Sequence, residues 1–252
     1  MQRSIEIMVD RIASILNKND PTIFLYGSVV LDDFKVGWSD IDFICLTKKS
    51  LESGQADELL FLRQTLTEEH ADNPYFRLFE GGILSLEAFI HDKEDTAVYW
   101  GSSGQRRTNR YALDCFGKMV LIEKGRLILG SDFRDRLLCP TREEIVSSIQ
   151  QHYKTIRMHG KSGVGWLLDI ARCLYTLRTN EVIAKTKAGE WALGENICPD
   201  VQVMERAIAV RSAPQKWFSH EETQRWMHTL TPFIQRFADV LEQELAKELL
   251  HN

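Results

Sequence analysis

The spacing of apolar residues changes near Cys139-Pro140, and this change constrains the fold more than any other feature of the sequence. Three apolar runs of strand length and two segments with helical spacing precede it: residues 22–26, 40–46 and 83–90, and residues 5–16 and 54–71. The glycine- and serine-rich stretch 99–110 is interpreted as a loop. After the change, Thr141 and Glu144 form a capping box, and the pattern stays helical almost to the end. We therefore predict an α+β protein, with an α/β domain at residues 1–140 and an all-helical bundle at residues 141–252.

The bulk composition excludes several classes of partner and site. Acidic residues outnumber basic ones, 36 to 31, so no broad basic face is expected and nucleic acid is not a predicted partner. The five cysteines are widely spaced and contain no CxxC pair, which indicates reduced thiols rather than a zinc site or a disulfide framework. The apolar runs fall short of the roughly 18 residues that span a membrane, and the N-terminus lacks the apolar core of a signal peptide. We therefore expect a cytoplasmic protein with no membrane partner; nothing in the sequence indicates its oligomeric state.

Residues 27–42, GSVVLDDFKVGWSDID, combine a glycine-serine turn with two carboxylates. Gly27-Ser28 follows the first apolar run directly, and such a turn offers backbone N–H groups and a hydroxyl to phosphate oxygens. Asp40 and Asp42 stand at alternate positions where the second apolar run begins, so their side chains share one face of a strand. Like charges at this spacing repel unless a cation lies between them, and Mg²⁺ prefers oxygen ligands. The stretch therefore predicts a site for one or two Mg²⁺ ions that bridge bound phosphates.

A third carboxylate on a neighbouring strand would complete such a metal site. The run 83–90 alternates, with apolar residues on one face and Glu87 on the other. Glu87 is therefore the predicted third acid. Glu80 and Asp92 are the alternatives that the pattern leaves open.

These patches resemble known enzymes. YGSVV…WSDIDFICL resembles the G-S-x(n)-[ST]-D-x-D signature of the DNA polymerase β-like nucleotidyltransferases. Residues 86–90 are similar to the third-carboxylate strand of the aminoglycoside adenylyltransferases, and residues 171–193 resemble the A-R-x-x-Y-T segment of their helical domain. The resemblance implies a polymerase β-like nucleotidyltransferase domain with a mixed sheet, followed by the helical bundle.

The resemblance also implies a role for each matching residue. Gly27, Ser28 and Ser39 would contact the triphosphate, and Asp40 and Asp42 would bind Mg²⁺. Glu87 would bind metal, act as the general base, or do both. Two residues of the helical half, Arg172 and Lys185, would contact the nucleotide phosphates. The chain departs from the family at Ala184, where serine is usual.

The implied reaction transfers a nucleoside monophosphate, AMP from the co-substrate ATP, to a hydroxyl of a small molecule and releases pyrophosphate. The acceptor would be an aminoglycoside or another antibiotic. One alternative is an adenylyltransferase that acts on a protein or on a toxin-antitoxin partner. Another is a non-catalytic nucleotide-binding relative, against which the intact set of acids argues.

The turn before residue 171 bears on the acceptor. In the aminoglycoside adenylyltransferases this turn carries acidic and amide residues that meet the polycationic drug. This chain has Ser162-Gly163-Val164-Gly165 there, and no acid until Asp169. Each ammonium group desolvated without a partner weakens binding. We therefore expect streptomycin and spectinomycin to be poor acceptors, and the natural acceptor to be another hydroxylated small molecule.

Overall fold

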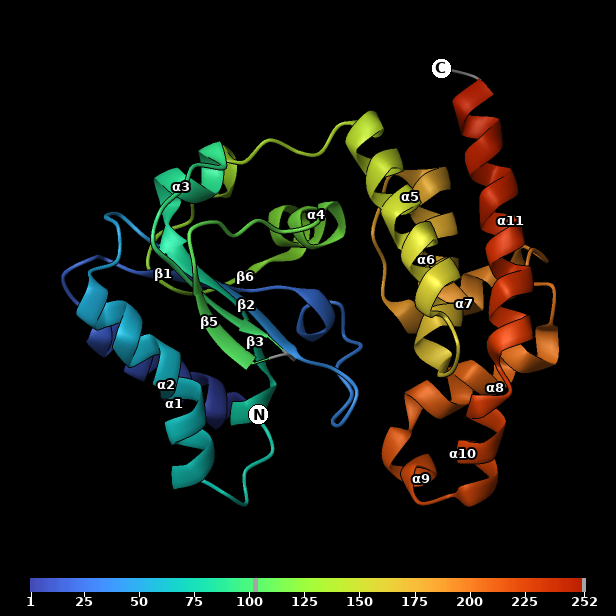
Figure 1. Ribbon diagram of the computed structural model, residues 1–252, viewed down its shortest axis with the longest axis horizontal. Coiled ribbons are helices and arrows are strands. Elements are labelled where there is room, and N and C mark those ends of the chain that lie inside the picture. Colours follow the sequence, from blue (N-terminus) through green and yellow to red (C-terminus); the bar gives the residue numbers. More distant parts are fainter. Residues whose placement is uncertain (102–103, 251–252) are drawn as a thin grey trace. The chain divides into compact units, whose positions relative to one another are not determined.

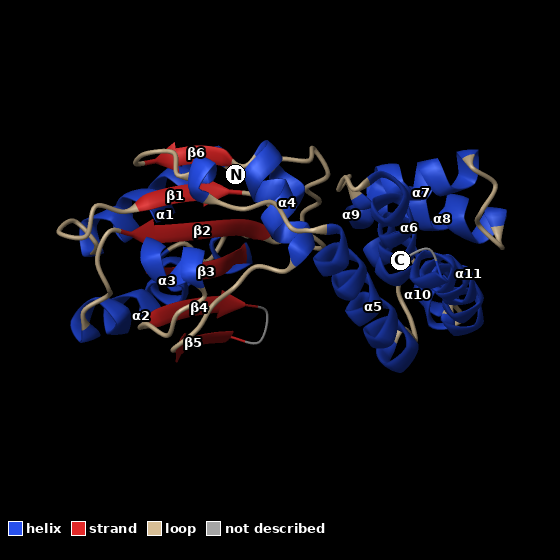
Figure 2. Ribbon diagram, turned by 90° about the horizontal axis from the view of Figure 1, so that it is seen from above, coloured by secondary structure: helices blue, strands red, loops and turns tan. Residues whose placement is uncertain are grey.

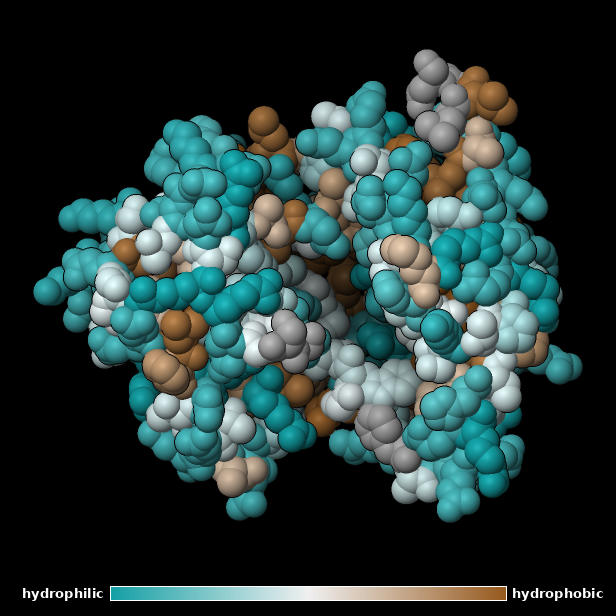
Figure 3. All heavy atoms as spheres, viewed as in Figure 1, coloured by the Kyte–Doolittle hydropathy of each residue, from teal (hydrophilic) through white to brown (hydrophobic). Residues whose placement is uncertain are grey.

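The computed structural model describes residues 1–101 and 104–250, and the chain divides into two compact units (Figures 1 and 2). The first unit comprises Met1–Phe34 and Ser39–Cys139. The second comprises Lys35–Trp38 and the chain from Pro140 onward. Hydrophilic residues cover most of the visible surface of each unit (Figure 3). Within the two described ranges, no helix combines the length and the apolar character needed to cross a membrane.

The first unit is built on one mixed six-stranded sheet, as the resemblance implied. Its strands are β1 (Thr22–Leu25), β2 (Ile41–Thr47), β3 (Phe79–Ser85), β4 (Ala97–Gly101), β5 (Gly104–Thr108) and β6 (Arg126–Leu129). Their order is β5-β4-β3-β2-β1-β6. Strands β2 and β3 pair in parallel, whereas every other neighbouring pair is antiparallel. The connection from β2 to β3 runs through a helix, as a parallel pair requires.

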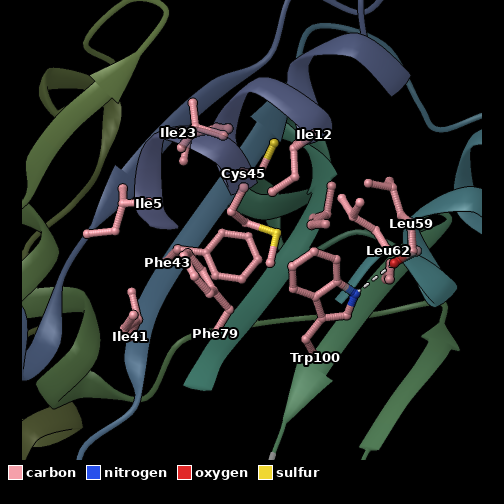
Figure 4. Close-up of a cluster of buried hydrophobic side chains, with 14 of the residues drawn as sticks. Ile5, Ile12, Ile23, Ile41, Phe43, Cys45, Leu59, Leu62, Phe79 and Trp100 are labelled. Atoms are coloured by element: carbon pink, nitrogen blue, oxygen red, sulfur yellow. Dashed lines mark hydrogen bonds between the residues drawn. The ribbon is translucent and has the colours of Figure 1, made fainter. Parts of the chain in front are cut away.

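Two long helices of this unit, α1 (Gln2–Ile15) and α2 (Ser53–Glu69), contribute to the core on one face of the sheet (Figure 4). Ile41, Phe43 and Cys45 alternate along β2 and all belong to this core. Trp100 is also fully buried there, and its indole N–H donates to the Leu59 carbonyl at 3.0 Å. Because side chains alternate between the faces of a strand, the even-numbered residues of β2, Asp42 among them, lie on the opposite face.

Two sequence predictions about this unit are wrong. Residues 83–90 are not a strand, because β3 ends at Ser85, whose hydroxyl accepts from the Ala88 N–H and caps helix α3 (Leu86–His91). Residues 99–110 are not a loop, because β4 and β5 pair as an antiparallel hairpin. Ser102 and Ser103, which the loop prediction included, lie outside the described residues. Helix α4 (Cys115–Lys124) completes the regular helices of the unit.

The second unit is all-helical apart from its connections, which confirms the prediction. Its helices are α5 (Arg142–His159), α6 (Val164–Thr179), α7 (Lys185–Gly194), α8 (Val201–Ser212), α9 (Pro214–Phe218), α10 (Glu221–His228) and α11 (Thr231–Leu250). The capping box at the start of α5 is present, since the Glu144 N–H donates to the Thr141 hydroxyl and the Thr141 N–H donates to the Glu144 carboxylate. Ten of the sixteen residues of α6 are buried, so this helix forms the centre of the bundle.

Candidate active site

A tight turn joins β1 to the acid-bearing face of the sheet. It is a short helical turn, Gly27–Val29, separated from the end of β1 by Tyr26 alone. The Tyr26 N–H donates to the Asp42 carbonyl at 3.0 Å, which ties the start of the turn to β2. Gly27 has a φ of +66°, and a Cβ at this position would overlap the Asp42 carboxylate. Glycine is therefore required here, because both its conformation and its lack of a side chain bring the backbone against the acid.

The two predicted phosphate-binding serines lie on either side of the connection from this turn to β2. The Ser28 hydroxyl donates to the Asp40 carbonyl at 3.4 Å, so the turn and the first aspartate are linked. The Ser39 side chain is buried, and its hydroxyl donates to the Asp33 carbonyl at 3.5 Å. Ser39 therefore contributes to the packing of the connection as well as standing next to Asp40.

Three carboxylates gather at the start of β2 and β3. Asp42 pairs in register with Glu80 across the parallel ladder, so the two side chains point to the same face of the sheet. Asp40 directly precedes β2 and interacts with the same group. Burial raises the pKa of the Asp40 carboxyl, and the negative charge of Glu80 raises it further, whereas Arg63 opposes both effects. A cation bound between these carboxylates would favour the ionised form of Asp40 and would relieve its repulsion by Glu80.

Glu87, the predicted third acid, lies elsewhere. Asp42 pairs with Glu80 while Thr47 pairs with Ser85, so Glu87 lies beyond the far end of the β2–β3 ladder. At about 3.3 Å per residue, that end is roughly 16 Å from Asp42. Glu87 is exposed and accepts a hydrogen bond from Arg136 at 2.7 Å, which lowers its pKa. The prediction that Glu87 joins the aspartates is therefore wrong, and the alternative acid Glu80 takes the position.

An aromatic residue that the sequence analysis did not single out fixes Glu80. The Tyr99 hydroxyl donates to Glu80 Oε1 at 2.9 Å. The Tyr99 ring is stacked on Tyr111, with centroids 5.9 Å apart, and the Arg106 guanidinium lies 4.4 Å from the ring centroid. Burial and the hydrogen bond to Glu80 raise the pKa of Tyr99, so the phenol stays protonated and keeps donating. The hydrogen bond from Tyr99 thereby fixes Oε1 of Glu80; the second oxygen of this carboxylate is Oε2.

A buried arginine supports the same acids. Arg63 of α2 is 9% exposed, and its guanidinium donates to the Phe79 carbonyl at 2.8 Å and the Gly101 carbonyl at 3.0 Å. Phe79 directly precedes Glu80, so this contact holds the beginning of β3. The positive charge of Arg63 also acts on Asp40 and Glu80. It therefore reduces the mutual repulsion of the carboxylates.

In the helical unit, both predicted phosphate-binding cations contact one buried acid, Asp169. Arg172 Nη2 lies 2.6 Å from Asp169 Oδ1, and Lys185 Nζ lies 3.4 Å from the same oxygen. His152 Nδ1 lies 2.9 Å from Asp169 Oδ2. Burial alone would raise the pKa of Asp169, but these three neighbours hold it well below its usual value. The ionised Asp169 therefore positions Arg172 and Lys185 together.

The donor sets show which cluster suits a divalent cation. Asp40, Asp42 and Glu80 offer only oxygen ligands and repel one another, which fits Mg²⁺. The second group, in which His152, Asp169 and Cys173 place their ligand atoms within 4.8 Å of one another, has different surroundings. Its carboxylate already faces two cations, so an added metal ion would be repelled.

Two family models match the chain. The nucleotidyltransferase domain matches residues 8–81, and the aminoglycoside adenylyltransferase C-terminal domain matches residues 140–243. The fold is similar to that of spectinomycin adenyltransferase AAD(9) from Enterococcus faecialis, whose crystal structure was determined with ATP and spectinomycin. This similarity has a TM-score of 0.66 at 19% sequence identity, and it covers 96% of this chain and 99% of that chain. No protein of curated function matches the chain. The chain is therefore an enzyme of the nucleotidyltransferase class that resembles the aminoglycoside adenylyltransferases.

Proposed function

We propose that the protein transfers AMP from ATP to a hydroxyl group of a small molecule and releases pyrophosphate. The observation that carries this proposal is the juxtaposition of Asp40, Asp42 and Glu80 with the Gly27-Ser28 turn. A phosphate-binding turn beside three acids is what an in-line phosphoryl displacement requires, because the phosphates and the ions that neutralise them must meet.

The turn would bind the phosphates of the nucleotide, whereas the acids would bind the metal ions. Backbone N–H groups of the turn at Gly27 and the Ser28 hydroxyl would bind oxygens of the triphosphate, and Ser39 stands beside them. Asp40, Asp42 and Glu80 would hold one or two Mg²⁺ ions, which supply positive charge to the triphosphate and the leaving pyrophosphate.

Glu80 is also the proposed general base. Tyr99 occupies Oε1, so Oε2 would accept the proton of the acceptor hydroxyl while the oxygen attacks the α-phosphorus and pyrophosphate leaves. A positioned base of this kind contributes about 10²–10⁴ in rate. Arg172 and Lys185, held together by Asp169, would contact the phosphates of the nucleotide and stabilise the charge on them.

The acceptor we propose is a hydroxylated small molecule of the antibiotic class. The family match of residues 140–243 and the spectinomycin in the similar crystal structure support this class. The same crystal structure supports ATP as the nucleotide.

A direct assay tests the proposal. The full-length protein is incubated with ATP labelled at the α-phosphate, Mg²⁺ and a panel of hydroxylated antibiotics, and both pyrophosphate and labelled small molecules are quantified. We expect label in a small molecule, and none with the variant Asp40→Asn/Asp42→Asn. Equal labelling by this double variant would refute the metal site. Label that appears only in protein would instead support the alternative adenylyltransferase acting on a macromolecule.

A further inference from the structure

Three tyrosines, Tyr26, Tyr99 and Tyr111, lie beside the carboxylates of the first unit. Tyr26 directly precedes the turn that begins at Gly27. Tyr99, on β4, donates to Glu80. Tyr111 lies in the connection from β5 to α4, outside any helix or strand. The position of Tyr111 therefore depends on the contacts of its side chain.

The glycine at position 82 makes room for the Tyr111 ring on the acid-bearing face of the sheet. Gly82 is two residues after Glu80, and Tyr99 pairs with it across β3 and β4, so the three residues share one face. A Cβ on Gly82 would lie 2.3 Å from the Tyr111 ring, and its three nearest atoms would all belong to that ring. Tyr111 therefore covers β3 directly beside Glu80.

From this position Tyr111 contacts the other two tyrosines. Its ring stacks on the Tyr99 ring, with centroids 5.9 Å apart and planes inclined by 30°. Its hydroxyl oxygen lies 3.5 Å from that of Tyr26, and either hydroxyl can donate. The Tyr26 backbone N–H in turn donates to the Asp42 carbonyl at 3.0 Å. The contacts thus form a closed series, which runs from Glu80 through the three tyrosines to its register partner Asp42.

The charges of the acids act on the same tyrosines. Burial is the main cause that raises the pKa of Tyr26 and of Tyr111, and the charge of Asp42 raises both further. Glu80 also raises the pKa of Tyr111. The Tyr111 hydroxyl therefore lies within range of both acids and keeps its proton, so it can take part in a hydrogen bond as a donor or as an acceptor.

We propose that Tyr111 is a positioning residue, which couples the orientation of Glu80 to the turn proposed to bind the triphosphate. Through Tyr99 it supports the acid that would take the proton of the acceptor hydroxyl. Through Tyr26 it contacts the residue from which the turn begins. Such coupling matters because a misplacement of reacting groups by about 1 Å can cost about 100-fold in rate. The inference rests on the proposed function for the role of Glu80 as the base.

Removing a single hydroxyl tests this role. Tyr111→Phe deletes the group that meets Tyr26 and keeps the ring that stacks on Tyr99. We expect kcat for pyrophosphate release to fall about fivefold, as for the loss of one neutral hydrogen bond, with an unchanged KM for ATP. The melting temperature should stay the same, whereas a merely structural role would lower it. A kcat within 1.5-fold of that of the unaltered protein would overturn the proposal.

Tyr175→Phe is the matched control. The Tyr175 hydroxyl donates to Glu181 at 3.2 Å within the helical unit, so this variant also deletes one phenol hydroxyl together with its hydrogen bond. We expect its kcat and KM to equal those of the unaltered protein. Equal losses of kcat in Tyr175→Phe and Tyr111→Phe would show that the effect is not specific to the acid-bearing face, and would overturn the proposal.

A double-mutant cycle tests the coupling itself. Tyr26→Phe removes one end of the series, and Tyr99→Phe removes the hydrogen bond that reaches Glu80. We expect Tyr26→Phe to lower kcat about fivefold in the unaltered protein but less than twofold in Tyr99→Phe, because the link to Glu80 is then already lost. The same fold-change in both backgrounds would show that the two tyrosines act independently, and would overturn the proposal.

A titration with Mn²⁺ tests the inference without turnover. Gly82→Ala adds no charge, but its Cβ would displace the Tyr111 ring. Because Glu80 is a ligand in the proposed metal site, we expect Gly82→Ala to weaken Mn²⁺ binding about tenfold and Tyr175→Phe to leave it unchanged. Unchanged Mn²⁺ affinity in a Gly82→Ala protein that is folded by circular dichroism would overturn the proposal. The proposed function fails by a different result, the absence of AMP transfer to any small molecule, which leaves the metal titration valid.

Discussion

Replacing Glu80 by glutamine tests whether Glu80, which the structure places beside the aspartates, is the third acid, rather than Glu87, which the sequence pattern favoured. Glutamine keeps the shape of the side chain and an oxygen for the Tyr99 hydroxyl, but it removes the negative charge and the basicity. Loss of a general base costs about 10²–10⁴ in rate, or about 2.7–5.4 kcal/mol in the activation barrier. We therefore expect pyrophosphate release at saturating ATP and acceptor to fall at least about 100-fold.

Glu87→Gln is the matched control, since it makes the same chemical change beyond the end of the β2–β3 ladder, which is roughly 16 Å from Asp42. It breaks an exposed ion pair with Arg136, and exposed pairs contribute little to stability. We expect activity within about twofold of the unaltered protein and an unchanged melting temperature. An inactive Glu87→Gln together with an active Glu80→Gln, both folded by circular dichroism, would refute the assignment of Glu80.

Three further substitutions test the surroundings of the acids and the buried carboxylate of the helical unit. Gly27→Ala should weaken Mn²⁺ binding in a direct metal titration, because the new Cβ overlaps the Asp42 carboxylate; unchanged affinity would contradict this geometry. Tyr99→Phe keeps the stacked ring and should lower metal affinity or turnover about 10–100-fold with little change in melting temperature, as for other residues that orient a ligand. Asp169→Asn should lower the stability of the protein by about 3–5 kcal/mol at pH 7. Because the folded-state pKa of Asp169 is depressed, its stabilisation is present above the usual value of 3.8 and is lost as the pH falls through the lower folded-state value; denaturant melts of the two proteins should therefore converge in strong acid.

The residue pattern was sufficient to predict the acid pair and the helical half. Asp40 and Asp42 were recognisable because the alternation of side chains between the two faces of a strand is a local property, and the two residues flank Ile41, where β2 begins. The capping box at Thr141 was likewise readable, since its two hydrogen bonds lie within four consecutive residues. In both cases the interactions that define the structure are close in sequence.

The sequence favoured Glu87 and left Glu80 only as an alternative, because the strand that carries Glu80 is defined by packing between distant segments. Gly81 and Gly82 follow Glu80, and glycine is depleted in strands, so the beginning of β3 carries no strand signal. In the structure a Cβ on Gly81 would overlap the Phe43 carbonyl, and a Cβ on Gly82 would overlap the Tyr111 ring. The glycines are therefore required by close approach, and only the fold reveals that requirement.

The errors at residues 83–90 and 99–110 have related causes. A run of eight residues is too short for apolar alternation to separate a strand from a strand followed by a helical turn, and the cap at Ser85 decides the outcome. Strand β5 is an edge strand with half-exposed or exposed side chains, so it needs no apolar alternation. Its pairing with β4 comes from backbone hydrogen bonds, which leave little trace in side-chain type.

The guanidinium of Arg63 bears on whether the protein folds before or after it binds a divalent ion. It is a permanent internal counter-ion, since arginine keeps its charge under ordinary conditions and its hydrogen bonds go to the carbonyls of Phe79 and Gly101. The beginnings of β2 and β3, which carry the carboxylates, can therefore reach their native arrangement during synthesis, before any divalent ion binds. This distinguishes the protein from small zinc domains, in which metal capture and folding are one event. Treatment with a chelator should accordingly abolish activity while the melting temperature stays nearly constant. Adding the ion back should restore activity without a delay for refolding.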